Sequence, residues 1–137
     1  MPAEKEEDLI VTPWGKSEVI YKGGTLGAMH KVKKLTVNPG QRMSLHSHNN
    51  RTEHFVVVAG CAILEAGNPQ PNDEGYCQLV RMQVGNGAMI AAGQRHRIGC
   101  WGPTPLVIIE TQLGRDMPRE EDITRYEDDY GRMAGRR

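Results

Sequence analysis

Short β-branched runs separated by glycine and proline are the feature that most constrains the fold of this chain. The 137 residues include 16 glycines and 8 prolines, which interrupt the apolar segments too often for long helices. Nine segments are predicted as strands, covering residues 18–21, 29–37, 42–48, 53–59, 62–66, 77–84, 88–91, 95–100 and 106–113. Many short strands with turns between them indicate an antiparallel sandwich or barrel, so the predicted fold class is all-β.

The predicted domain organisation is simple. A chain of 137 residues fits one domain whose core needs no disulfide or metal staples. We expect residues 1–10 to be a flexible N-terminal segment, 11–132 to be the folded domain and 133–137 to be a C-terminal tail. Turn residues predict an exposed loop over 67–75, inside the domain. The charged stretch from Met117 is compatible with a short helix or an edge segment.

Charge and cysteine content argue against several classes of function. The 17 basic and 17 acidic residues cancel, so no net charge attracts nucleic acid or an anionic membrane. No apolar run approaches the length of a membrane span, and the polar, acidic start is unlike a secretion signal. Three cysteines without C-x-x-C spacing suggest neither a disulfide framework nor a thiolate zinc site. We therefore expect a cytoplasmic protein with no nucleic-acid or membrane partner.

Three of the five histidines, with one glutamate, form a pattern typical of a metal site. His46 and His48 are two residues apart, so on one strand they point to the same face. Residues 49–52 are predicted to form a four-residue hairpin loop, because Asn tolerates left-handed backbone angles. That loop would place Glu53 opposite His48 in an antiparallel pair, close enough to share a metal. His96, three residues after a glycine, would add an imidazole from a separate segment.

Strand parity separates these residues from the other histidines. His54 follows Glu53 directly, so its side chain must point away from the site. His54 and His30 are predicted to be surface or hydrogen-bonded residues. The pattern therefore predicts one divalent transition metal, with Zn, Mn, Fe, Co and Ni as candidates. The predicted ligands are His46, His48, Glu53 and His96.

The spacing of these ligands resembles the two motifs of the cupin superfamily. Every spaced position of the first motif is present, namely Gly40, His46, His48, Glu53 and Gly60. The second motif is matched at Gly85, Gly93 and His96, but Ala91 stands where proline is usual and Cys100 where asparagine is usual. Cupins are small jelly-roll barrels, or double-stranded β-helices, that hold a metal on three His and one Glu. The resemblance thus implies a single cupin domain.

A closer resemblance, over roughly residues 11–132, is to the cupin domain of type II mannose-6-phosphate isomerases. The segments that carry it are 13–15, 31–40, 51–57, 93–97, 109–114, 121–125 and 129–132. In that family the cupin is often fused behind a mannose-1-phosphate guanylyltransferase domain. This chain has no Gly-rich nucleotide-binding segment, and it resembles a stand-alone cupin.

The resemblance implies interconversion of mannose 6-phosphate and fructose 6-phosphate, with the sugar phosphate as the partner. This isomerisation passes through an enediolate and needs a Lewis acid, a base and cations for the phosphate. Lys33 shares strand parity with Leu35 and Val37, so it is expected to line the cavity, and Glu110 is the candidate base. Both are the predicted catalytic residues. The predicted substrate-binding residues are Arg51, Arg97 and Gln112. The alternative for each charged residue is a solvated surface position.

Two departures from the isomerase pattern leave other functions open. That pattern usually carries Gln at the position of His46 and a His–His pair at Asn49 and Asn50. An imidazole at position 46 strengthens metal binding and suits cupin oxygenases and decarboxylases. A metal-dependent dioxygenase or decarboxylase is therefore the alternative enzyme, and a non-catalytic sugar- or sugar-nucleotide-binding cupin is the third hypothesis. We also expect a homodimer formed through an exposed strand edge.

Overall fold

The computed structural model describes residues 8–67 and 77–133. The elements of regular secondary structure in those ranges are all β-strands. The strands are β1 (Leu9–Thr12), β2 (Gly15–Thr25), β3 (Ala28–Val37), β4 (Leu45–Ser47), β5 (Thr52–Ala59), β6 (Ala62–Gly67), β7 (Cys77–Met82), β8 (Gly87–Ile90), β9 (His96–Cys100), β10 (Leu106–Gly114) and β11 (Thr124–Glu127). The predicted all-β class is confirmed. Among the described residues there is also no helix that could cross a membrane.

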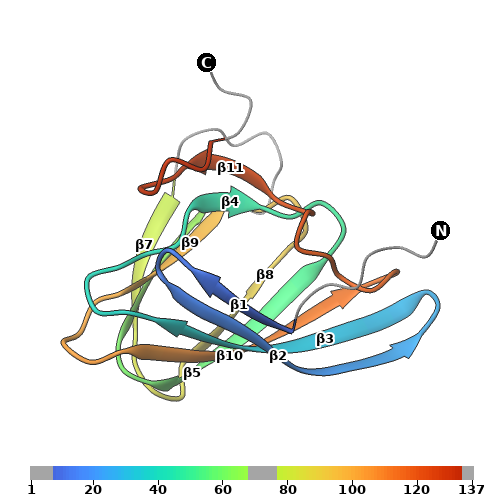
Figure 1. Cartoon of the computed structure of the whole chain (residues 1–137), viewed down its shortest axis with the longest axis horizontal. Coiled ribbons are helices and arrows are strands. Elements are labelled where there is room, and N and C mark those ends of the chain that lie inside the picture. Colours follow the sequence, from blue (N-terminus) through green and yellow to red (C-terminus); the bar gives the residue numbers. More distant parts are fainter. Residues whose placement is uncertain (1–7, 68–76, 134–137) are drawn as a thin grey trace.

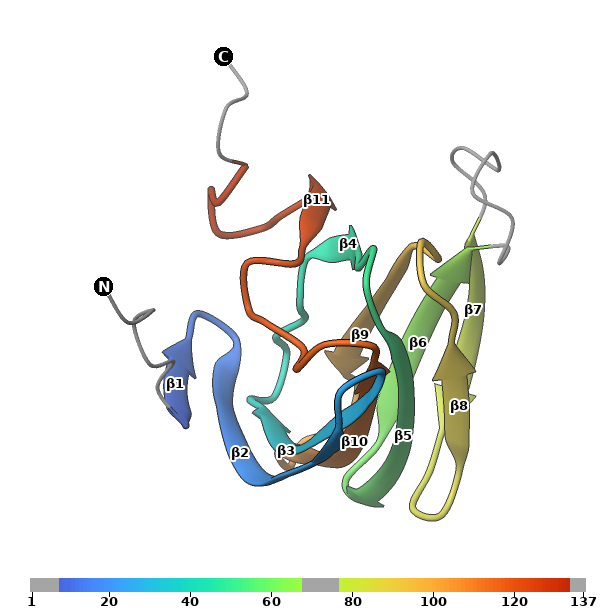
Figure 2. The same cartoon turned by 90° about the vertical axis from the view of Figure 1, so that its right-hand side faces the viewer.

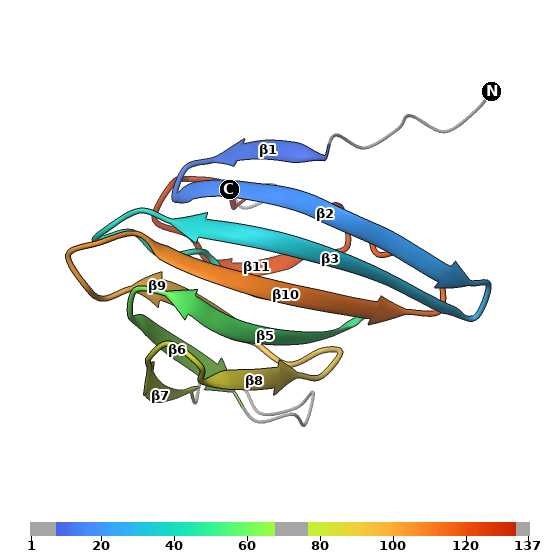
Figure 3. The same cartoon turned by 90° about the horizontal axis from the view of Figure 1, so that it is seen from below.

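The strands form two antiparallel sheets that face each other around a common interior (Figures 1 and 2). The six-stranded sheet has the order β1-β2-β3-β10-β5-β8, which can be followed from edge to edge in Figure 3. The five-stranded sheet has the order β11-β4-β9-β6-β7. Strands far apart in sequence are therefore neighbours, and the residues of the two cupin-like motifs meet inside.

All nine predicted segments contain a strand, but two strands were not predicted. Strand β1 pairs with β2 and starts at Leu9, inside the stretch expected to be flexible. Strand β11 pairs with β4 at the edge of the smaller sheet, in the region after Met117 that was compatible with a helix or an edge segment. The predicted loop at 67–75 lies outside the described residues, apart from Gly67 at the end of β6.

The predicted hairpin at residues 49–52 is wrong. Strand β4 lies between β11 and β9 in the smaller sheet, whereas β5 lies between β10 and β8 in the larger one. The segment 48–51 therefore carries the chain from one sheet to the other. Local sequence does not distinguish the two outcomes, because a four-residue Asn-containing connection suits both a tight turn back and a crossing between sheets.

The inward faces of β3, β5 and β10 change from apolar to polar along each strand. On β10, Leu106 and Ile108 are buried at one end, and Glu110 and Gln112 are buried at the other. The pairing register broadly repeats this division on the neighbouring strands. Ile108 is aligned with Leu35 and Val57, and Gln112 with Lys31 and Glu53, while Glu110 lies between Lys33 on β3 and the apolar Phe55 on β5. One end of the barrel is therefore an apolar core, and the other end collects buried polar groups.

Candidate metal centre and its cavity

Three buried histidines converge at the polar end of the barrel. One ring nitrogen from each of His46, His48 and His96 lies within 4.8 Å of the others. His46 on β4 lies directly opposite His96 on β9 in the antiparallel register, and their ring centroids are 4.5 Å apart. His48 follows the end of β4 and shares the inward side with His46, as strand parity predicted.

Each of the three rings is oriented by a hydrogen bond between Nδ1 and a main-chain carbonyl. The acceptors are Ser44 for His46 at 2.8 Å, Asp122 for His48 at 2.5 Å, and Gln94 for His96 at 2.9 Å. Because a carbonyl oxygen can only accept, Nδ1 carries the proton and Nε2 is left as the lone-pair donor of the neutral ring. Hydrogen bonds of this kind typically orient histidines that bind metals, so the rings fit a metal ion.

The turn before His96 is held against the first motif. Gly93 has a φ of 81°, in the left-handed region that favours glycine, and its N–H donates to the His48 carbonyl at 2.7 Å. The following Gln94 donates from its N–H to the Ala91 carbonyl at 3.1 Å, closing the turn. The carbonyl that orients His96 is therefore positioned by the same turn that contacts His48.

Glu53 reaches the histidines from the opposite sheet. Its Oε1 lies 3.1 Å from His96 Nε2, and its Oε2 lies 3.5 Å from His48 Nε2. Glu53 is 2% exposed, whereas the next residue, His54, is exposed on the outer face, as predicted. The four predicted ligands thus meet across the interior of the barrel, and not across a hairpin.

Arg51 contacts two of these four side chains. Its Nε donates to Glu53 Oε2 at 3.0 Å, and one terminal nitrogen, Nη2, donates to His48 Nε2 at 3.1 Å. The other terminal nitrogen, Nη1, donates to the carbonyl of Arg119 at 3.0 Å. The neutral ring of His48 has one lone pair on Nε2, so a metal that binds there must displace the Arg51 contact.

Burial and neighbouring charges give the cluster protonation states that suit a cation. Burial, with help from the His96 and His48 rings, holds the pKa of His46 well below its ordinary value. Burial also lowers the pKa of His48 to about 4, despite the opposing charge of Glu53. Burial would raise the pKa of Glu53, but its hydrogen bond to His96 and the nearby charges hold that pKa well below the usual range. Near neutral pH this leaves His46 and His48 as neutral imidazoles beside a carboxylate, groups that suit a divalent transition metal.

His96 differs from the other two histidines in its protonation. Burial acts to lower its pKa, but the hydrogen bond and the charge of Glu53 outweigh this effect and raise it. A proton on His96 Nε2 therefore occupies the place in which a metal would join the same two groups.

A cavity of about 400 Å³ lies next to the cluster. It is lined by the four candidate ligands and by four further residues that the sequence analysis singled out, namely Lys33, Arg51, Glu110 and Gln112. Lys33 is buried and pairs through Nζ with the carboxylate of Glu120. Its inward position on β3, which parity with Leu35 and Val37 predicted, is confirmed.

Glu110 and Gln112 interact with each other and with the metal-ligand candidate Glu53. Gln112 Nε2 lies 3.1 Å from Glu110 Oε2 and 3.3 Å from Glu53 Oε2, so it can donate to both carboxylates. Burial of Glu110 and the negative charge of Glu53 raise the pKa of Glu110 to about 7. Glu110 is thus a carboxyl group that can exchange a proton near neutral pH.

Arg97 is not brought into this cavity. Its guanidinium is buried, with Nε donating to the Met43 carbonyl at 3.0 Å and Nη2 to the Glu127 carbonyl at 3.3 Å. It lines a separate pocket of about 200 Å³ that also includes Arg42 and Asp129. The reason is strand alternation, because Arg97 follows the inward-pointing His96 on β9 and must point to the other side.

Two arginines that the sequence analysis did not select do line the cavity. Arg125 lies on β11, and Arg132 follows in the C-terminal segment. Both fall within segments that resemble the isomerase cupin, at 121–125 and 129–132, and this was the signal available for them. Without the pairing of β11 to β4, nothing in the sequence places either residue near His46.

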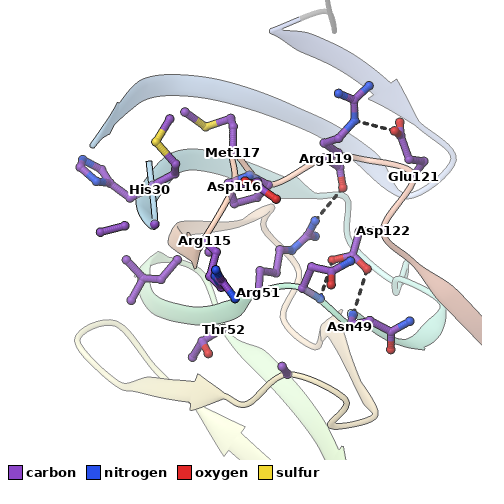
Figure 4. Close-up of a pocket in the computed structure, with 18 residues that line it drawn as sticks. His30, Asn49, Arg51, Thr52, Arg115, Asp116, Met117, Arg119, Glu121 and Asp122 are labelled. Carbon is purple, nitrogen blue, oxygen red and sulfur yellow. Dashed lines mark hydrogen bonds and ion pairs between the residues drawn. The ribbon is translucent and has the colours of Figure 1, made fainter. Parts of the chain in front are cut away.

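A second, wider hollow of about 1310 Å³ is also lined by Arg51 (Figure 4). In Figure 4 the Arg51 side chain points to the main chain of Arg119, and the Asp122 carboxylate lies against the main chain of residues 49 and 50. The Asn49 N–H donates to Asp122 Oδ1 at 2.9 Å, and the Asn50 N–H donates to Oδ2 at 3.0 Å. The segment 119–122 is therefore attached to the residues that lead from β4 into β5.

Comparison with known families identifies relatives across nearly the whole chain. Residues 3–128 match the family described as mannose-6-phosphate isomerase C-terminal. The chain is 34% identical over 123 residues to the xanthan biosynthesis protein XanB of Xanthomonas campestris, and 37% identical over 125 residues to the alginate biosynthesis protein AlgA of Pseudomonas aeruginosa. These matches cover 90% and 91% of this chain, but only 23% of each relative. The chain thus corresponds to about a quarter of these larger proteins.

Solved structures show the same fold at lower sequence identity. The capsular polysaccharide assembling protein CapF of Staphylococcus aureus superposes with a TM-score of 0.66 at 22% identity, covering 87% of this chain and 34% of CapF. Oxalate decarboxylase of Bacillus subtilis, studied for its Mn(II) centres, gives a TM-score of 0.66 at 20% identity, covering 87% of this chain and 30% of that protein. The predicted cupin-type jelly roll is therefore confirmed.

Proposed function

The chain belongs to the mannose-6-phosphate isomerase C-terminal family, and we propose that it is a metal-dependent sugar-phosphate isomerase that interconverts mannose 6-phosphate and fructose 6-phosphate. One observation carries the proposal. Glu110, a buried carboxyl group with a pKa of about 7, lines the same cavity as the candidate metal ligands His46, His48, Glu53 and His96. An aldose–ketose isomerisation needs both components in one site.

Glu110 is the proposed proton carrier. A base with a pKa near the working pH is able both to accept a proton and to give it back. Glu110 would take the proton from C2 of mannose 6-phosphate and return it to C1, while the hydroxyl proton on the C2 oxygen passes to the C1 oxygen. Together the two transfers give the ketose with no net change in the enzyme. Gln112 is the proposed positioning residue, because its amide lies within hydrogen-bond distance of Glu110 Oε2 at 3.1 Å.

The ligand cluster would bind the metal through the Nε2 atoms of the three histidines and the carboxylate of Glu53. When bound, the metal would act as a Lewis acid for the sugar oxygens on C1 and C2. Trp14, Leu35 and Ile98 form an apolar part of the cavity wall.

A coupled assay tests this function. Protein loaded in turn with Zn, Mn, Fe, Co or Ni is given mannose 6-phosphate, and fructose 6-phosphate is detected through phosphoglucose isomerase and glucose-6-phosphate dehydrogenase. We expect turnover with at least one metal. Glu110→Gln should lose kcat while keeping its metal, and Glu65→Gln, which changes a carboxylate outside the cavity, should behave as wild type. Absence of product with every metal would reject the isomerase.

A metal-dependent dioxygenase or decarboxylase is the second candidate, and one observation favours it. The third imidazole, from His46, takes part in the ligand cluster where the isomerase pattern carries a glutamine. Oxygen consumption with a small organic acid, or release of carbon dioxide from it, would support this candidate, provided that the same preparation leaves mannose 6-phosphate unchanged.

A further inference from the structure

Arg125 lines the cavity beside the histidine cluster, and one of its hydrogen-bond donors has no partner in the described part of the chain. Its Nε is buried and has no hydrogen-bond partner in the part of the chain that the structure describes. Buried donors are nearly always satisfied, and leaving one unpaired next to a cavity is costly. Because Arg125 also lines the cavity, its guanidinium is a candidate partner for an anionic ligand.

The pairing of β11 with β4 places this arginine beside the candidate metal centre. Arg125 lies directly opposite His46 in the antiparallel register. Residues opposite each other in such a pair point to the same face of the sheet, so Arg125 extends into the cavity that His46 also lines. Figures 1 and 2 both show β11 running along β4 at the rim of the barrel.

A second arginine adds to the positive charge at this position. Arg132 also lines the cavity, and its guanidinium donates to Asp128 through Nε at 3.0 Å and through Nη2 at 2.9 Å. Burial, followed by the charge of Arg132, lowers the pKa of Arg125. One carboxylate, Asp128, faces both arginines, so the group keeps an excess positive charge.

The other cationic residues of interest already have carboxylate or carbonyl partners. Lys33 pairs with Glu120, and Arg51 donates to Glu53. Arg97, which the sequence analysis selected for substrate binding, donates to two main-chain carbonyls away from this cavity. Among the arginines that line the cavity in the described part of the chain, Arg125 is the one with a buried nitrogen that has no hydrogen-bond partner.

We propose that Arg125, assisted by Arg132, binds the phosphate group of a sugar phosphate whose opposite end faces the histidine cluster. A guanidinium matches two phosphate oxygens with a pair of charge-assisted hydrogen bonds. In a hexose 6-phosphate the phosphate lies at the far end of the sugar from C1 and C2, so the anion and the metal would bind opposite ends of the sugar. The choice of sugar rests on the proposed function, but the anion site itself does not.

The test measures binding to the metal-loaded full chain by calorimetry, with mannose 6-phosphate, inorganic phosphate and mannose as probes. Arg125→Gln should weaken mannose 6-phosphate binding roughly ten- to a hundredfold, as expected for the loss of a charge-assisted contact. It should leave mannose binding and metal content unchanged. The affinity of Arg125→Lys for mannose 6-phosphate should fall between those of Arg125→Gln and wild type. Lysine keeps the positive charge but lacks the planar guanidinium that donates two parallel hydrogen bonds. Arg132→Gln should weaken binding in the same direction.

Arg95→Gln is the matched control. The Arg95 guanidinium lies 3.7 Å from the ring centroid of Tyr126, the neighbour of Arg125, and Arg95 does not line the cavity. This variant should bind all probes as wild type does. If Arg125→Gln does not fold, the affinities of Arg125→Lys and Arg132→Gln for mannose 6-phosphate, measured in the same assay, test the anion site in its place.

The outcomes separate this inference from the isomerase proposal. Wild-type affinity for mannose 6-phosphate in Arg125→Gln, or no saturable binding of it to wild type, would overturn the anion site. Arg125-dependent binding without turnover would support the anion site and reject only the isomerase. Turnover with an unchanged KM in Arg125→Gln would reject the anion site and leave the isomerase in place.

Discussion

Arg51 donates a hydrogen bond from Nε to Oε2 of Glu53 at 3.0 Å, with both side chains buried at the polar end of the barrel. The same guanidinium donates to His48 Nε2 at 3.1 Å. An internal cation thus contacts two groups that are predicted to bind a metal ion. Arg51 and the metal are therefore expected to compete for His48 Nε2.

Replacing Arg51 by Met removes this competition. We expect tighter metal binding, because His48 Nε2 no longer has to give up a hydrogen bond. We also expect the metal-free protein to lose about 1.5–3 kcal/mol of unfolding free energy, since a charge-assisted contact to buried Glu53 disappears. Chelator competition measures the first effect and denaturant unfolding the second. Arg97→Met is the control: its guanidinium donates to main-chain carbonyls, so it should lower stability without tighter metal binding. Metal affinity that drops in Arg51→Met would contradict competition.

The ligand set is tested by removing single members. His48→Ala and Glu53→Ala should each abolish stoichiometric metal, because every ligand atom of the cluster comes from a different side chain. His54→Ala should keep a full complement, since His54 is exposed on the outer face of β5. Elemental analysis of purified protein gives the answer, and full metal in both cluster variants would rule out the four-ligand site.

Glu110 should make the metal-free protein less stable as the pH rises. Its folded pKa of about 7 lies above its ordinary value of 4.5, so folding favours the protonated form. Its contribution is fully present below about pH 4.5 and is lost as the pH rises through about 7, which amounts to ~3 kcal/mol. His48, with a pKa lowered to about 4, acts in the opposite sense, so the comparison must be made between variants.

Glu110→Gln provides that comparison, because Gln has the shape of a protonated Glu and does not titrate. Unfolding free energies of both proteins, measured with chelator present, should diverge between pH 5 and pH 8 in favour of the variant. A difference that stays constant over this range would show that Glu110 has an ordinary pKa.

Asp122 should support His48 indirectly. Its carboxylate accepts the N–H groups of Asn49 and Asn50, and its carbonyl orients the His48 ring. Asp122→Ala should remove the hydrogen bonds from the Asn49 and Asn50 N–H groups, so that the Asp122 carbonyl holds the His48 ring less firmly. Metal binding should then weaken about ten- to a hundredfold, as for other groups that orient metal ligands. Glu121→Ala changes the neighbouring carboxylate, which pairs with the exposed side chain of Arg119, and should leave metal affinity unaltered. Equal metal affinity in both variants would exclude a supporting role for Asp122.

The sequence pattern alone predicted the direction of a side chain correctly wherever that direction depends on a single strand. Alternation along β5 directs Glu53 inward and His54 outward, and alternation along β3 buries Lys33 beside Leu35. These side-chain directions depend on residues close together in sequence, whose geometry follows from the two-residue period of a strand. The cupin fold, by contrast, was implied by the resemblance of the spacing of His46, His48, Glu53 and His96 to the two cupin motifs.

The tertiary structure alone decided which segments meet. It placed β4 and β5 in different sheets, so Glu53 approaches the histidines across the barrel and not across a turn. It also paired β11 with β4, which brought Arg125 opposite His46, and it turned Arg97 away from the cavity. Pairing between distant strands depends on how whole sheets pack and which faces they bury, and this information is not contained in the period of any single strand.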